Sequence, residues 1–146
     1  MSSSNERLQR IAEALMLKPA DALTPAQRTF AIAWELDAEV SAGSLHQYFM
    51  NSAGGREAAA ALRAIGAEDA AEIVAEAVGA ADAPHLDWSD DEQRQDHMGD
   101  LDEDIEDELE ALDDRLHASA EPLADRLAAF ADANPQAFTR EALASA

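Results

Sequence analysis

Carboxylates dominate one stretch of the chain, residues 87–114. It reads DWSDDEQRQDHMGDLDEDIEDELEALDD, with fifteen Asp or Glu and one Arg in twenty-eight residues. The formal charge of the whole chain is −21, and this fifth of it carries most of that charge. Such charge repels itself in a compact fold, so it predicts either a disordered tail or a surface whose function needs a negative field. The chemistry it could perform is the binding of Lys and Arg side chains on a basic partner.

Apolar residues recur within this stretch at the spacing of a helix. They follow one another at intervals of three or four and are Met98, Leu101, Ile105, Leu109, Leu112 and Leu116. At 100° per residue they fall within a sector of roughly 80°, which is typical of the buried stripe of an amphipathic helix. The sequence therefore predicts a folded acidic helix here, because a disordered tail would lack this periodicity.

Carboxylates occupy the face opposite the stripe, and we call them the acidic ridge: Asp96, Asp100, Glu103, Glu106, Asp107, Glu110 and Asp114. Further acidic surface is expected from Asp87, Asp90, Asp91 and Glu92. Surface helices usually mix signs, because like charges four residues apart repel. Only Arg94 and Arg115 relieve this ridge, one near each end. The ridge is predicted to bind a partner, the alternative being a solvated face, and whether Gly99 breaks the helix stays open.

The expected ridge is sparser than a strand of DNA. Leaving Glu106 aside, six carboxylates of the ridge lie along a helical rise of about 27 Å, which gives one carboxylate about every 5 Å. A DNA strand presents one phosphate about every 3.4 Å of its axis. A convincing imitation of DNA would therefore need added acidic residues or a second copy of the chain.

The sequence has no motif for catalysis or for binding a metal ion or cofactor, so we expect no catalytic residue, no metal ligand and no cofactor. The four histidines lack the spacing of zinc ligands, and the chain has no cysteine. They are His46, His85, His97 and His117. The excess of carboxylates argues against direct contact with nucleic acid or with anionic membranes. Without a signal peptide or membrane span at hand, a cytoplasmic location is expected.

Helix signals recur along the whole chain, and no run alternates polar and apolar residues for long enough to suggest a strand. The clearest helix start is Thr24-Pro25-Ala26-Gln27, which has capping-box spacing and a Pro at the first helical position. The 146 residues are 47% apolar but only 5% aromatic. We expect an all-α fold, a compact bundle-like array of about seven or eight helices in a single domain, 1–146.

Residues 39–54, EVSAGSLHQYFMNSAG, form the most motif-like segment. They resemble the signature E-x-N-x-G-G-F-x-Q-[FY]-F-x-N-S-x-G of a bacterial family that includes an acidic DNA-mimic protein. The matching positions are Glu39, Gly43, Gln47, Tyr48, Phe49, Asn51, Ser52 and Gly54, whereas Ser41, Ala42, Ser44 and Leu45 depart from the pattern. The family-like region runs from about residue 30 to 138, and residues 1–20 are expected to add an N-terminal helix.

The resemblance implies an all-α fold, a homodimer and, for the DNA-mimic member, a surface that occupies a helix-turn-helix regulator. The signature itself is interpreted as mainly structural, with Tyr48 and Phe49 in the core and Gln47 as a capping side chain. We expect a non-enzymatic protein that binds a basic DNA-binding protein and blocks its access to DNA. The alternatives are an immunity-type protein that neutralises a basic toxin such as a nuclease, or an acidic dimeric scaffold domain without mimicry.

Overall fold

The computed structural model describes residues 2–119 and 123–144, and in these two ranges it contains nine α-helices and no strand. The predicted all-α fold is confirmed. The helices are α1 (Ser2–Met16), α2 (Pro25–Ala42), α3 (Leu45–Asn51), α4 (Gly55–Ala64), α5 (Glu68–Ala81), α6 (Asp91–Gly99), α7 (Glu103–Ala118), α8 (Leu123–Ala133) and α9 (Arg140–Ala144). Two 3₁₀ turns, Ala20–Ala22 and Pro135–Ala137, join them. None of the described helices is long and apolar enough to cross a membrane.

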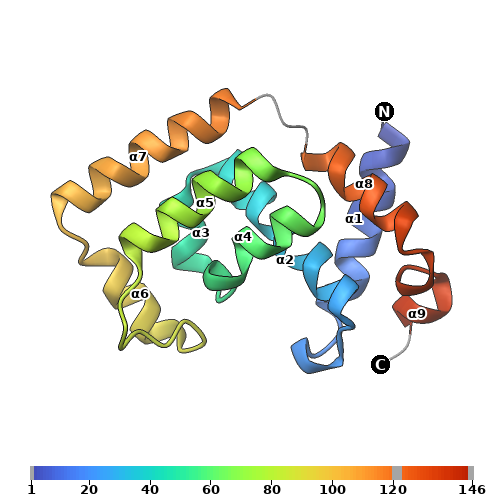
Figure 1. The fold of residues 1–146 in the computed structure, drawn as a ribbon. Helices are drawn as coiled ribbons and strands as arrows, with labels where there is room; N and C mark the ends of the chain where they lie inside the picture. Colours follow the sequence, from blue (N-terminus) through green and yellow to red (C-terminus); the bar gives the residue numbers. More distant parts are fainter. Residues whose placement is uncertain (1, 120–122, 145–146) are drawn as a thin grey trace.

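The helices form a central group with one acidic and one terminal end (Figure 1). Helices α2, α3, α4 and α5 make the centre, where α4 packs on α2 and α5. Helix α7 lies along α5, and α6 packs against α3. At the opposite end α1, α8 and α9 lie together, close to both ends of the chain. The acidic segment is thus on the far side of the molecule from the termini.

Helix α2 starts as its sequence predicts. The Thr24 hydroxyl accepts a hydrogen bond from the Gln27 amide at 3.2 Å, and the Gln27 side chain accepts one from the Thr24 amide at 3.0 Å. This reciprocal capping box satisfies two amides that the first helical turn leaves without partners. Gln27 is itself buried, and its Nε2 donates to the carbonyl of Ala137 at 2.9 Å. One side chain therefore starts α2 and ties it to the C-terminal segment.

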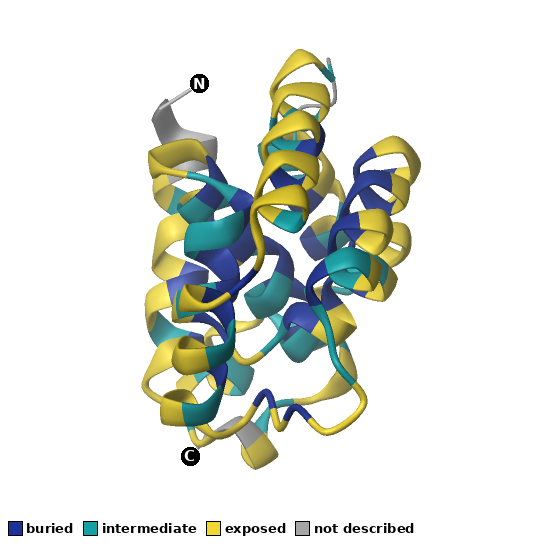
Figure 2. Cartoon of the chain, turned by 90° about the vertical axis from the view of Figure 1, so that its left-hand side faces the viewer, coloured by how far each residue is buried: buried dark blue, intermediate teal, exposed yellow. Residues whose placement is uncertain are grey.

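The core is built from inward-facing residues of most helices, while exposed residues cover the outer faces (Figure 2). Phe30, Tyr48 and Phe49 are completely buried. Trp34 is only half-buried and stacks against Phe30 with ring centroids 6.4 Å apart. Apolar burial of this kind drives most of the folding free energy.

The acidic segment is folded, but it forms two helices and not one. Asp100 ends α6, Leu101 turns into the core, and Asp102 takes an extended conformation before α7. The predicted apolar stripe does pack inward: Met98, Leu109 and Leu112 are buried, and Ile105 and Leu116 half-buried. The prediction of one continuous ridge from Asp96 to Asp114 is therefore wrong, because the break turns α6 away from the axis of α7 (Figure 1).

The loop that leads into the acidic segment is held by an aspartate. Asp82 accepts hydrogen bonds from Arg56 Nε at 2.8 Å and from Trp88 Nε1 at 2.9 Å. Partial burial of Asp82 opposes ionisation, but these bonds and the amide of Ala83 outweigh it and hold the pKa of Asp82 below its usual value. The Trp88 ring lies so close to Gly55 that any side chain there would overlap it.

Arg94, a residue of α6, is buried where this loop meets α3. Its Nη1 donates to the carbonyl of Trp88 at 2.6 Å and its Nη2 to the carbonyl of Met50 at 3.2 Å. Nη2 also lies 3.0 Å from Asp91. Arg94 was expected to relieve the ridge from the surface, but only 2% of its side chain is exposed. A buried guanidinium with several acceptors fixes its surroundings, because removal of its partners or of itself leaves unpaired polar groups.

We expect Arg94→Met to lower the free energy of unfolding by about 2–4 kcal/mol, because the carbonyls of Trp88 and Met50 lose their charged donor. Urea denaturation followed by circular dichroism measures this change. Arg63→Met is the matched control: Arg63 is exposed and should shift stability by no more than about 0.5 kcal/mol. Equal effects of the two substitutions would show that Arg94 does not anchor the segment.

We expect Gly99→Ala to leave the break between α6 and α7 in place. Gly66 is the one glycine with positive φ among the described residues, and a Cβ on Gly99 would meet no atom within 4 Å. The substitution should therefore raise the free energy of unfolding by about 0.4–1 kcal/mol through the unfolded state. Backbone chemical shifts test the geometry, and helical shifts running through residues 100–102 would contradict it.

Candidate partner-binding surface

Five members of the acidic ridge lie on α7 and share one face of it. Glu103, Glu106, Asp107, Glu110 and Asp114 are all exposed, and we call these five the α7 ridge. The helical period places them opposite Leu109 and Leu112, which are buried. Burial of those leucines against the α5 side of the fold therefore decides that the five carboxylates point to solvent.

No cation of the described residues neutralises this face. Arg115 lies on another side of α7, where its Nη1 pairs with Glu76 of α5 at 2.8 Å. Arg94 lies on α6 and is buried. The sequence places both arginines at the ends of the ridge, but the structure directs both elsewhere. The α7 ridge is therefore more uniformly negative than the sequence indicates.

The remaining predicted acidic positions are exposed but separate from the α7 ridge along the chain. Asp96 lies on α6, and Asp100 lies in the break between the two helices. Most of the others have local structural roles. Asp90 caps α6 by accepting from the Gln93 amide at 3.0 Å, and Asp91 pairs with Arg94.

Asp87 has a similar local role. It accepts hydrogen bonds from the hydroxyl of Ser89 at 2.6 Å and from the amide of Ser89 at 3.0 Å. These bonds lower the pKa of Asp87. Glu92 has no described partner. Of the four residues predicted as additional acidic surface, three therefore help to build the turn before α6.

A hollow of about 310 Å³ runs between α3 and α7 beside the α7 ridge. Its walls include Glu106, Glu110, Asp113 and His46. Asp113 accepts a hydrogen bond from the Leu45 amide at 2.9 Å, at the start of α3. Partial burial raises the pKa of Asp113 although this bond opposes the shift. Asp113 thus joins α7 to α3.

Sequence reasoning missed the roles of Asp113, His46 and Arg94. Arg94 lies four residues before Met98, on the buried stripe, so its burial could have been inferred from the helical period. Asp113 follows the buried Leu112 and precedes the ridge member Asp114, which places it at the border of the apolar face. No sequence signal pairs His46 with the carbonyl of Met98, to which its Nε2 donates at 2.8 Å.

The signature segment forms an internal cluster between α2 and α3. The Glu39 carboxylate accepts from Gln47 Nε2 at 2.9 Å and from Asn51 Nδ2 at 3.0 Å. The expectation that the Gln47 side chain caps α3 is wrong, because that side chain reaches back to α2. Ser44 caps α3, with its hydroxyl accepting from the Gln47 amide at 3.1 Å. A Cβ on Gly43 would overlap the end of the Gln47 side chain, so a larger residue there would require that side chain to move.

The other signature residues surround Tyr48. Tyr48 and Phe49 are completely buried, and burial raises the pKa of the Tyr48 hydroxyl. Ser52 accepts from the Gly54 amide at 3.1 Å and so shapes the turn between α3 and α4. A side chain on Gly54 would crowd the Tyr48 hydroxyl. Each of the eight signature positions is therefore either buried in the core or in contact with another signature residue.

Three of the histidines contact backbone carbonyls, and the ring of the fourth, His85, lies edge-on to that of His97 with ring centroids 6.4 Å apart. His97 Nε2 donates to the carbonyl of Ala81 at 2.7 Å, and His117 Nδ1 to that of Asp113 at 2.8 Å. Within the described ranges, no group of three His, Asp or Glu side chains has the geometry to hold a metal ion. The candidate site is therefore the exposed acidic face of α7.

Comparison with known proteins places most of the chain in one family. The family model of DMP19-like proteins matches residues 21–134, which include α2 to α8 and the whole acidic segment. The resemblance drawn from the signature covers a similar region, residues 30–138. No curated protein and no solved structure gives a significant match. Because the family model matches far more than half of the chain, the chain belongs to the DMP19-like protein family.

Proposed function

We propose that this protein is a DNA mimic that binds a basic DNA-binding protein of the helix-turn-helix type and blocks its access to DNA. Membership of the DMP19-like family suggests DNA mimicry at a coarse level. The observation that carries the proposal to particular residues is the α7 ridge, five exposed carboxylates on one helical face without a neighbouring cation. These carboxylates would pair with the Lys and Arg side chains that otherwise hold DNA phosphates.

The spacing of the α7 ridge supports this role. From Glu103 to Asp114 the helix rises about 17 Å, so the five carboxylates follow one another at about 4 Å. A DNA strand has one phosphate about every 3.4 Å of its axis. The α7 ridge thus approaches the linear charge of one strand over about five phosphates. A homodimer, which is part of the proposal, would present two such ridges.

The rigidity of α7 supports the same role. Leu109 and Leu112 fix the helix against the fold, and Asp113 ties it to the start of α3. A charged surface held in place loses less conformational entropy on binding than a mobile tail does. The net charge of −21 adds long-range attraction to a basic partner and speeds encounter.

We also propose that the protein is not an enzyme, needs no cofactor, acts in the cytoplasm and binds neither nucleic acid nor membranes. An immunity protein for a basic nuclease would use the same electrostatic contacts. The two functions differ in what is displaced, since a DNA mimic competes with DNA for a regulator, whereas an immunity protein suppresses the activity of a toxin. Family membership favours the first.

We expect the triple substitution Glu103→Lys, Asp107→Lys and Glu110→Lys to abolish competition with DNA. The experiment isolates binding proteins from a lysate of the source cells at low salt, identifies them by mass spectrometry, and measures by fluorescence anisotropy how the purified chain displaces operator DNA from the partner. Reversal of three charges replaces attraction by repulsion, so affinity for the partner should fall by about 100-fold or more.

The matched control is Glu6→Lys, Glu13→Lys and Asp125→Lys, which changes net charge by the same amount on exposed residues of α1 and α8. It should retain most of the affinity. Helical circular dichroism must be preserved in both variants. Competition by the α7 variant at wild-type strength, or equal loss in both variants, would refute the assignment of binding to α7.

We expect affinity for the partner to fall by about tenfold or more when monovalent salt rises from 50 to 200 mM. Exposed charges act through solvent, and the screening length shortens over this range. Isothermal titration calorimetry at several salt concentrations gives the slope, and the α7 charge-reversal variant should flatten it. Affinity that does not change with salt would contradict binding through the α7 ridge.

A further inference from the structure

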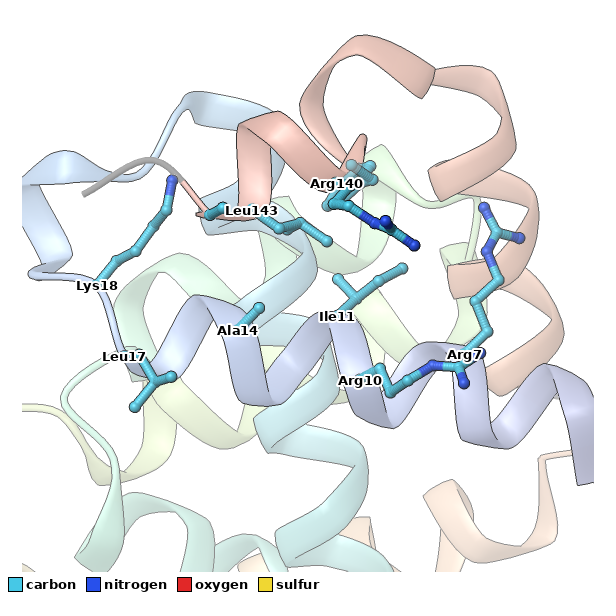
Figure 3. A pocket seen from close by; sticks show the side chains of 10 residues that line it. Arg7, Arg10, Ile11, Ala14, Leu17, Lys18, Arg140 and Leu143 are labelled. Carbon is cyan, nitrogen blue, oxygen red and sulfur yellow. The ribbon is translucent and has the colours of Figure 1, made fainter.

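A groove on the opposite end of the molecule has the reverse chemistry of α7. It runs between α1 and the C-terminal segment and has a volume of about 790 Å³. Arg7, Arg10 and Arg140 lie toward one end and Lys18 at the other (Figure 3). Both walls lie outside the range matched by the family model, residues 21–134. The groove is therefore a feature that family membership does not explain.

The charge of the groove is unexpected for this chain. The sequence has 31 Asp and Glu against 10 Lys and Arg, yet four basic residues and no carboxylate line the groove. A surface of average composition here would carry about three acidic residues for each basic one. Cations gathered in this way repel one another, and a bound anion would remove that repulsion.

Two of the four cations have partners within the protein, and these partners bridge the groove. Arg7 pairs with Asp132 of α8 at 2.8 Å, and Lys18 Nζ donates to the carbonyl of Ala142 at 2.7 Å. Among the described residues, Arg10 and Arg140 have no ion pair and no side-chain hydrogen bond. Their guanidinium groups are thus available to a carboxylate or phosphate, which Arg binds with two parallel hydrogen bonds.

Apolar side chains line the groove between its charged ends. Ile11, Leu17 and Leu143 lie along it in Figure 3. Leu17 is 89% exposed and the adjacent Met16 is 77% exposed, and these are the two large apolar side chains most open to water among the described residues. An exposed apolar strip beside unpaired cations suits a ligand with an apolar body and an anionic head.

The dimensions favour a small ligand over a protein helix. From Arg7 to Met16, the last residue of α1, the helix advances about 14 Å, and Lys18 lies just beyond it. The Arg7–Asp132 pair joins α1 to α8, and the Lys18–Ala142 hydrogen bond joins the segment after α1 to α9, so a helix longer than the groove would have to displace both contacts. The net charge of −21 also repels a strongly acidic protein at long range, whereas a small ion with one charge is repelled far less.

We propose that this groove binds a small amphipathic anion, such as a medium- or long-chain carboxylate, with its head at Arg10 and Arg140 and its chain along Ile11, Leu17 and Leu143. The site is independent of the α7 ridge and of the proposed DNA mimicry. It gives the protein a second binding surface, for a metabolite-sized ligand, on the end that carries both termini.

Titration of the full-length ¹⁵N-labelled protein with sodium dodecanoate, below its micelle concentration, tests the proposal. Amide shifts should change in residues 7–18 and 138–144. Dodecanoate should bind about tenfold or more tighter than butanoate, because each additional buried methylene strengthens binding. It should also bind about tenfold or more tighter than dodecanol, which lacks the charge that the arginines pair with.

The double variant Arg10→Gln with Arg140→Gln should weaken dodecanoate binding by about tenfold or more. Its matched control, Arg63→Gln with Arg115→Gln, changes net charge equally on exposed residues of α4 and α7 and should bind as the wild type does. Leu17→Ser, at an exposed position where folding is little affected, should reduce the advantage of dodecanoate over butanoate.

Several outcomes would overturn the proposal. Inorganic phosphate or butanoate binding as tightly as dodecanoate would show a simple anion site. Equal weakening in the two double variants would show a general charge effect, and shifts confined to other residues would show another site. Binding of an acidic amphipathic peptide or of anionic vesicles without binding of dodecanoate would make the groove a docking surface for those partners instead.

Discussion

Two arginines hold the most acidic part of the chain on the core, and the candidate binding surface depends on them. Arg56 fastens the loop after α5 through Asp82, which also binds the Trp88 indole. Arg94 joins that loop to α3 through the carbonyls of Trp88 and Met50. A segment with this much negative charge would otherwise be driven from the fold by self-repulsion. The buried Arg94 and the exposed Arg56 therefore position α6 and, after it, the carboxylates of α7.

The fold class and the apolar faces could be predicted from the sequence, because helical periodicity and caps are local signals. The Thr24–Gln27 box and the buried Leu109 and Leu112 illustrate this. The break after Gly99 could not be predicted, since the glycine has no positive φ that would mark a turn. In the structure the break holds the buried Leu101 and the extended Asp102. Hydrogen bonds between side chains of different helices could not be predicted either. The spacing of Gln47 does not indicate that its side chain binds Glu39 instead of capping α3.

The correction to the acidic segment makes the candidate site smaller and better defined. Asp96 and Asp100 are not part of the α7 ridge, and Asp87, Asp90 and Asp91 have partners within the fold. The five carboxylates that remain on α7, Glu106 included, follow one another at about 4 Å along the helix. Basic residues collect at the other end, around α1 and α9. The molecule thus separates charge along its length, and each end suits a different class of ligand.

The structure of a complex between the protein and its DNA-binding partner, by crystallography or electron microscopy, tests the central claim most directly. The account predicts that Glu103, Asp107 and Glu110 lie within about 4 Å of Lys or Arg side chains that contact phosphates when the partner binds DNA. A complex in which the partner leaves α7 in solvent, or in which its DNA-binding surface stays open, would contradict it.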